Sequence, residues 1–224
     1  IVLEAGSGAD SSTWSAVIDP LATTTRTCAY DRAGRGRSDT RGDHTLADAA
    51  IDLWTLLAVA GERGPFVVVG HSLGGAYSRV FASAHRTDVV GLVLVDTFDP
   101  DILEDRIHPL LGSLRAEYEA DLDGLRDIVS RVDGLDMTVS ETQLRASRLD
   151  GIAIEVLTAA RYEPRLDRAT NAAVVDARTQ GFESLSPGNV RVTIAYGVGH
   201  MIQVERPDLV IDAARRLIER ARGG

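Results

Sequence analysis

The chain has 224 residues, of which 44% are hydrophobic and 25% charged, so we expect a folded globular protein and exclude extended disorder. Its formal net charge of −9 argues against a nucleic-acid partner. The one cysteine, Cys28, excludes an intrachain disulfide and a multi-cysteine zinc site. The longest apolar run, residues 89–95, is far shorter than a bilayer span, so we expect no membrane segment.

Six short apolar runs predict β-strands. Several are continuous runs of Val, Ile and Leu, a pattern typical of strands buried on both faces of a parallel sheet. The expected strands are residues 1–3, 27–30, 66–69, 90–95, 153–157 and 190–195.

Helical patterns lie between these strands, at residues 46–60, 75–85 and 208–221. In the first and the last of them, apolar residues recur along one side of the helix, and the middle one follows a predicted strand with almost no loop. Strands alternating with helices indicate right-handed crossovers and a three-layer α/β domain, with helices on both faces of a mostly parallel sheet.

One long segment interrupts this alternation. Residues 99–151 contain no strong strand pattern, but leucines and a tyrosine recur at helical spacing. A connection of this length far exceeds an ordinary loop, so we interpret it as an inserted helical cap. The expected organisation is core 1–98, cap 99–152 and core 153–224.

The chain begins inside a predicted strand. We therefore expect an upstream segment to be missing, and the N-terminal residues show no signal peptide. On that basis the sequence predicts a cytoplasmic protein.

The most specific motif is Gly-His-Ser-Leu-Gly at residues 70–74, directly between a predicted strand and a predicted helix. A serine on so sharp a turn projects its hydroxyl above the sheet edge. Glycines at 70 and 74 let the backbone fold back closely. Ser72 is therefore the candidate nucleophile, and the backbone N–H of Leu73 is a candidate oxyanion donor.

A nucleophilic serine needs a base, and His200 is the candidate among five histidines. It follows the last predicted strand and precedes the last helix, which places it at the same sheet edge as Ser72. His71 should point away from its neighbour Ser72, and His85 ends a helix. His44 and His108 lie in polar segments that we expect to be exposed.

Two carboxylates at strand ends are candidates for the acid that orients His200: Asp96 and Glu163. The small-residue loop after the first strand, residues 4–8, lets backbone approach a substrate oxygen. Its N–H at Ser7 is the second candidate oxyanion donor beside Leu73.

Three blocks together resemble the α/β-hydrolase superfamily: residues 30–38 (Tyr-Asp-Arg-Ala-Gly-Arg-Gly-Arg-Ser), residues 70–75 and residues 199–207. The resemblance covers nearly the whole chain. It implies Ser72 as nucleophile, His200 as general base and acid, and residues 31–38 as a structural turn. Members usually begin with two more strands, which this chain lacks.

The resemblance also bears on the acid. Some members place it 24 residues after the nucleophile, the spacing from Ser72 to Asp96. Others place it on a Gly-x-x-Asp turn, where this chain reads Ala-Arg-Tyr-Glu at residues 160–163. We prefer Asp96 and keep Glu163 as the alternative.

Together these features predict a serine hydrolase that cleaves a carboxylic ester or lactone through an acyl-enzyme. Such chemistry needs neither metal nor organic cofactor. The expected partner is a small-molecule substrate, mid-sized and apolar, and no nucleic-acid partner is expected. The oligomeric state is left open. The alternatives are a carbon–carbon bond hydrolase of a dicarbonyl compound, or a non-catalytic binding protein on the same scaffold.

Overall fold

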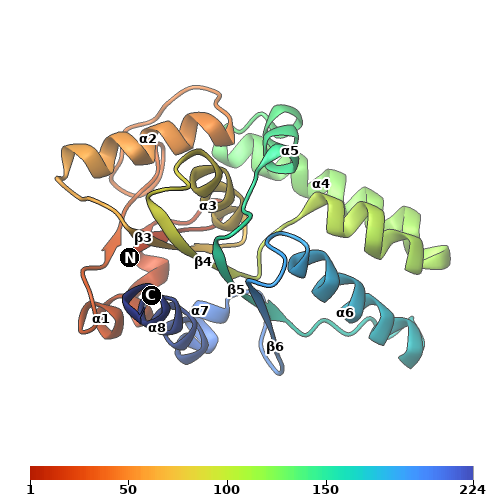
Figure 1. Cartoon of the computed structure of the whole chain (residues 1–224). Helices are drawn as coiled ribbons and strands as arrows, with labels where there is room; N and C mark the ends of the chain where they lie inside the picture. Colours follow the sequence, from red (N-terminus) through yellow and green to blue (C-terminus); the bar gives the residue numbers. More distant parts are fainter. Residues whose placement is uncertain (224) are drawn as a thin grey trace.

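A single parallel β-sheet forms the centre of the computed structural model, which describes residues 1–223 (Figure 1). Its six strands follow the spatial order β2-β1-β3-β4-β5-β6, and every neighbouring pair is parallel. The strands are β1 (Val2–Glu4), β2 (Cys28–Ala29), β3 (Phe66–His71), β4 (Val89–Val95), β5 (Ala153–Ala159) and β6 (Val190–Ala195). All six predicted strands are present.

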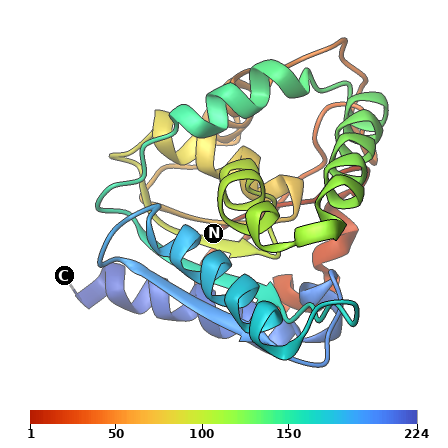
Figure 2. The same ribbon diagram turned by 90° about the vertical axis from the view of Figure 1, so that its right-hand side faces the viewer.

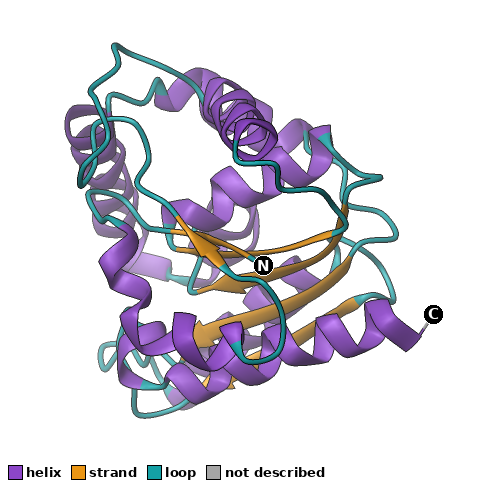
Figure 3. Cartoon of the chain, turned by 90° about the vertical axis from the view of Figure 1, so that its left-hand side faces the viewer, coloured by secondary structure: helices purple, strands orange, loops and turns teal. Residues whose placement is uncertain are grey.

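Helices cover both faces of this sheet, as Figure 3 shows. Successive strand residues point to opposite faces, so Val68 packs into one core while Val67 and Val69 pack into the other. On the first face lie α2 (Leu46–Val59), α3 (Leu73–Ala84) and α6 (Arg168–Glu183). On the second face lie α1 (Ser15–Ala22), α7 (Ile202–Glu205) and α8 (Pro207–Gly223). The predicted three-layer α/β architecture is confirmed.

The segment between β4 and β5 is helical, as the spacing predicts. Short helical turns at Ile102–Ile107, His108–Leu110 and Gly112–Leu114 lead into α4 (Arg115–Asp133) and α5 (Met137–Ala146). Both lie on the side of the sheet that α2 and α3 cover, and α5 packs against these two helices (Figure 2). The exact domain boundaries at 98/99 and 152/153 stay a prediction, and residue 224, the expected end of the second core part, lies outside the described residues.

The strand order creates a crevice at one edge of the sheet. The chain leaves β1 for β2 on one side and later returns to β3 on the other. At such a reversal, the loops after the two strands diverge and leave room for a ligand at their carboxyl ends. Ser7 follows β1 and Ser72 follows β3, so both lie at this reversal.

Sequence patterning missed α1 and α6. Pro20 interrupts the pattern of α1, although it lies inside the helix. In α6 the fully buried residues are few, with Phe182 the one large apolar side chain among them, so the helix carries a weak apolar stripe. None of the helices within residues 1–223 has the length and hydropathy needed to cross a bilayer.

The expectation that His44 and His108 are exposed was wrong. Their exposed fractions are 8% and 3%. His44 forms an isolated β-bridge with Leu135 and stacks on Tyr77, with ring centroids 6.5 Å apart. Both residues are covered by contacts distant in sequence, which local polarity does not reveal.

Candidate active site

The turn after β3 holds Ser72 in a conformation that few non-glycine residues adopt. Its φ is 52° and its ψ is −122°. Backbone strain of this kind costs about 1–3 kcal/mol and persists where the surrounding structure enforces it. The Ser72 N–H donates to the Val95 carbonyl (2.9 Å), and the Thr97 hydroxyl donates to the Ser72 carbonyl (2.8 Å). The serine is thereby fixed on the sheet edge.

Two glycines make this turn sterically possible. An ideal Cβ on Gly70 would lie 2.4 Å from the Gly74 carbonyl oxygen, and a Cβ on Gly74 would lie 2.3 Å from the Glu4 carbonyl oxygen. Both neighbours are backbone atoms that cannot move aside easily. The glycine spacing in the motif therefore reflects close approach of α3 to β1 and β3.

His200 lies in the loop between β6 and α7 and makes a short contact with Asp96. Its Nδ1 is 2.7 Å from the Asp96 Oδ2 atom. The loop is anchored on the opposite side by His71, whose Nε2–H donates to the His200 carbonyl (3.0 Å). The backbone of His200 is thus held by the residue that precedes the candidate nucleophile.

Asp96 is buried at the end of β4, with an exposed fraction of 6% and a φ of 42°. Its Oδ1 accepts the Ala159 N–H (3.0 Å), while Arg161 donates to Oδ2 (2.5 Å) alongside His200. Burial raises the pKa of Asp96, but the His200 hydrogen bond, the Arg161 charge and the Ala159 N–H outweigh burial and lower this pKa to about 2. The ionised carboxylate only accepts, so His200 donates from Nδ1 and its Nε2 is left as a proton acceptor.

Glu163, the alternative acid, is engaged elsewhere. The Tyr118 hydroxyl donates to its Oε2 (2.7 Å), and the Arg165 guanidinium donates to Oε1 (2.8 Å). Hydrogen bonds from Arg165 and Tyr118 lower the pKa of Glu163 to about 2. The structure therefore brings Asp96, and not Glu163, to His200.

The candidate oxyanion donors lie on the two loops of the crevice. Leu73 is the first residue of α3, so its N–H has no acceptor within the helix. The loop at Ser7 is oriented by Arg32, which donates to the Ala5 carbonyl and to the Gly6 carbonyl (2.6 Å). Since the Gly6 carbonyl faces Arg32, the Ser7 N–H of the same peptide points the opposite way.

The helical segment between β4 and β5 is tied to this loop through Asp133, the last residue of α4. Its carboxylate accepts from the Ser7 hydroxyl and from the Gly8 N–H (3.3 Å), and it also faces Arg32 (3.6 Å) and Arg35 (3.3 Å). These contacts couple the position of the candidate cap to that of the Ser7 loop.

A pocket of about 320 Å³ contains both Ser72 and His200. Its apolar wall consists of Phe98, Ile102, Leu103, Leu125 and Phe182. Its polar lining consists of Ser72, Asp96, Thr97, Asp99, Thr158, Arg161, Arg178 and His200. This concave, partly apolar site with a few convergent polar groups is typical of a small-molecule pocket.

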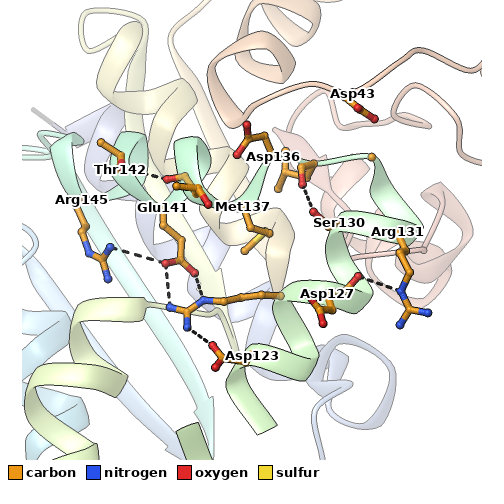
Figure 4. A pocket seen from close by; sticks show the side chains of 14 residues that line it. Asp43, Asp123, Asp127, Ser130, Arg131, Asp136, Met137, Glu141, Thr142 and Arg145 are labelled. Carbon is orange, nitrogen blue, oxygen red and sulfur yellow. Dashed lines mark hydrogen bonds and ion pairs between the residues drawn. The ribbon is translucent and has the colours of Figure 1, made fainter. Parts of the chain in front are cut away.

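A larger hollow of about 860 Å³ lies between α4 and α5, and neither Ser72, Asp96 nor His200 lines it (Figure 4). Its charged side chains pair with one another, as Glu141 does with Arg126 (2.7 Å) and Arg145 (3.7 Å). We therefore place the candidate site in the smaller pocket. Across residues 1–223, no group of three or more His, Cys, Asp and Glu side chains is arranged to hold a metal ion.

Sequence reasoning missed three arginines of this region: Arg32, Arg161 and Arg178. Arg32 lies in the block read as a structural turn, and its contacts with Ala5 and Gly6 depend on tertiary structure. Arg161 was signalled by the unusual turn at residues 160–163, where the resemblance predicts Gly-x-x-Asp. No local signal marks Arg178.

A parallel sheet with a strained serine turn and a paired histidine at its carboxyl edge defines a hydrolase of the α/β class. The alpha/beta hydrolase family profile matches residues 1–213. The chain therefore belongs to the alpha/beta hydrolase family, as the sequence blocks predicted.

Some proteins are similar to this chain over part of its sequence, and others share its fold. An uncharacterized protein of Schizosaccharomyces pombe, C23C11.06c, is 43% identical over 86 residues, which make up 38% of this chain and 16% of that protein. A thermophilic esterase from Thermogutta terrifontis shares the fold with a TM-score of 0.60 and 21% identity, over 98% of this chain and 89% of its own. Est816, described as an N-acyl homoserine lactone degrading enzyme, also shares the fold, with a TM-score of 0.57 and 19% identity, over 96% of this chain and 91% of its own.

Proposed function

We propose that the chain is a serine hydrolase that cleaves a carboxylic ester or lactone through an acyl-enzyme. Ser72 is the nucleophile, His200 the general base and acid, and Asp96 the carboxylate that orients His200. The observation that carries this proposal is the 2.7 Å contact between His200 Nδ1 and Asp96, in the pocket that also presents Ser72 on a strained turn.

In the first half-reaction, the Ser72 oxygen attacks the carbonyl carbon while His200 Nε2 takes the hydroxyl proton. Negative charge develops on the carbonyl oxygen and is stabilised by the N–H groups of Leu73 and Ser7. Collapse of the tetrahedral intermediate breaks the carbon–oxygen bond, and His200 returns the proton to the departing alkoxide. The acyl group is left on Ser72; for a lactone the released hydroxyl stays attached to it.

In the second half-reaction, water attacks the acyl-enzyme and transfers a proton to His200. The same two N–H groups hold the second oxyanion. Collapse breaks the bond to the Ser72 oxygen, which recovers its proton from His200, and the carboxylic acid leaves. Asp96 remains ionised throughout and stabilises the imidazolium that forms in each step.

We further propose that residues 99–152 act as a cap over this chemistry. Leu125 from α4 lines the pocket of Ser72, and Asp133 from the same helix binds the Ser7 loop. Leu125, Phe98 and Phe182 supply apolar surface for a substrate chain. The cap thus contributes to substrate binding and to the position of an oxyanion donor.

The test compares hydrolysis of p-nitrophenyl butyrate and of a δ-lactone by the parent chain and by Ser72→Ala. Loss of the nucleophile should reduce kcat by at least about 10³-fold, since only the oxyanion hole and binding remain. Circular dichroism confirms that the variant is folded. The proposal fails if the parent turns over neither substrate, or if Ser72→Ala retains activity within about tenfold of the parent.

A further inference from the structure

Arg178, on α6, is a partly buried cation that the proposed reaction does not use. It lines the pocket that contains Ser72. Its side-chain hydrogen bond is a long one, from Nη1 to the Thr158 hydroxyl (3.4 Å). Among the residues that the structure describes, no carboxylate lies within 4.0 Å of its guanidinium nitrogens.

Other buried arginines of this chain have an acidic partner. Arg79 is paired with Asp99, and Arg32 with Glu4. A guanidinium withdrawn from water without a counter-ion carries a desolvation cost of several kcal/mol. Burial, followed by the positive charge of Arg161, lowers the pKa of Arg178, which reflects the same unfavourable environment.

The side chains that line this pocket include two positive groups, Arg161 and Arg178, and two negative groups, Asp96 and Asp99. Asp99 is already neutralised by Arg79, and Asp96 binds Arg161 and His200 through one oxygen. One positive charge, that of Arg178, is left without a partner in the pocket.

An anion on the substrate would supply that partner. A guanidinium presents its N–H groups in a fork that matches a carboxylate and forms two parallel charge-assisted hydrogen bonds. Arg161, which is paired with Asp96 and whose side chain is 59% exposed, lines the same pocket and adds positive charge there. The apolar wall then takes the hydrocarbon between the carboxylate and the reacting carbonyl.

We propose that the ester or lactone cleaved at Ser72 carries a carboxylate, and that Arg178 binds it. This inference rests on the proposed function and adds the substrate class. The carboxylate belongs either to the acyl part or to the alcohol part of the substrate, and the two cases need separate probes.

The first experiment measures kcat/KM for matched pairs of esters at constant ionic strength. For the acyl side, mono-p-nitrophenyl glutarate is compared with p-nitrophenyl pentanoate; for the alcohol side, 4-butyryloxybenzoate is compared with its methyl ester. In one of these pairs, the parent should favour the anionic ester by about 10- to 100-fold, the range expected of hydrogen bonds to a charged group.

Variants assign that preference to a residue. Arg178→Met should reduce the ratio of anionic to neutral kcat/KM to about one, because the apolar stem stays and the charge is lost. Arg178→Lys should keep part of the ratio. The matched control is Arg168→Met, which removes an exposed arginine from the same helix and should leave the ratio and the activity unchanged.

A binding measurement separates the failure of this inference from the failure of the proposed function. Calorimetry with Ser72→Ala compares monomethyl glutarate and monomethyl succinate with their dimethyl esters. For the alcohol side, the same measurement compares 4-butyryloxybenzoate with its methyl ester. In at least one of these comparisons the acid should bind at least about tenfold more tightly than the neutral ester, and added Arg178→Met should remove the difference. Equal binding in the acyl-side and the alcohol-side comparisons, or a preference that survives Arg178→Met, overturns the inference whether or not the parent hydrolyses esters.

Discussion

Replacement of Asp96 by asparagine tests the role of this carboxylate most informatively. The amide has the same shape but one donating nitrogen in place of an accepting oxygen. Both oxygens of Asp96 accept from donors: Oδ1 from the Ala159 N–H, and Oδ2 from His200 and Arg161. Whichever way the amide turns, its NH₂ group meets an N–H donor.

The two orientations affect catalysis differently. With NH₂ toward His200, the ring must accept at Nδ1 and carry its proton on Nε2, so it no longer accepts from Ser72. With NH₂ toward Ala159, the amide N–H of the new asparagine and the backbone N–H of Ala159 repel each other. In the parent chain, Asp96 Oδ1 accepts this Ala159 N–H at 3.0 Å. In both orientations, the negative charge that stabilises the imidazolium is lost. Arg161 then lies beside a neutral amide in place of a carboxylate.

The expected loss in kcat therefore approaches the roughly 10⁴-fold found when a triad carboxylate is converted to its amide. At 1.36 kcal/mol per factor of ten, the barrier rises by about 5 kcal/mol. The assay is hydrolysis of p-nitrophenyl butyrate under saturating conditions, with folding checked by circular dichroism.

The control is Glu163→Gln, which changes a carboxylate bound by Arg165 and Tyr118. It should keep kcat within about tenfold of the parent, since this group contacts no reacting atom. A severe loss in Glu163→Gln with a mild loss in Asp96→Asn would move the acid to Glu163. Mild losses in both would show that neither carboxylate orients His200.

Three further outcomes follow from the geometry. Arg32→Lys keeps a charge beside Glu4 but releases the Gly6 carbonyl, so the Ser7 N–H of the same peptide is no longer held in place. The value of kcat should fall by about 10²-fold or more, the effect of one lost oxyanion donor. An unchanged kcat would show that the Ser7 N–H is not an oxyanion donor. Burial, with repulsion from His200, lowers the pKa of His71 to about 4 from its ordinary 6.5. The unfolded chain therefore binds a proton on His71 more readily than the folded chain, and the free energy of unfolding should decrease by about 2–3 kcal/mol between pH 6.5 and pH 4.5. In urea unfolding, His71→Gln should lack that decrease. An identical pH dependence of the variant and the parent would contradict the assignment. Gly74→Ala should prevent folding or destabilise the chain severely, because its Cβ would meet the Glu4 carbonyl oxygen, whereas Gly124→Ala in open space on α4 should stabilise the chain by about 1 kcal/mol in thermal unfolding. Equal stabilities of the two variants would show that the turn at Ser72 tolerates a side chain at position 74.

The strands and the serine turn were predictable because their signals are local. The continuous apolar run that forms β3 is buried at every position, and the glycines at 70 and 74 are required by contacts within the turn and with β1. The sequence order of Ser72 and His200 relative to the strands placed both at one sheet edge. The structure shows them lining one pocket.

The acid could not be chosen from local pattern, since Asp96 and Glu163 both follow core strands. The choice depends on which carboxylate faces His200, a contact between residues more than 100 positions apart in the case of Asp96. Arg161 and Arg178 escaped notice for the same reason. In a sequence, an arginine is interpreted by default as an exposed, solvated charge. The fold is needed to show which groups surround it and whether any of them is acidic.

The central claim is that Ser72 is an activated nucleophile, and covalent labelling tests it most directly. The chain is treated with a fluorophosphonate, which reacts with serines activated by a neighbouring base, and the modified residue is located by peptide mass spectrometry. The account predicts one modification, at Ser72, which is abolished in Ser72→Ala and strongly slowed in His200→Gln. Absence of labelling in the folded parent chain, or labelling at another serine that persists in Ser72→Ala, would contradict it.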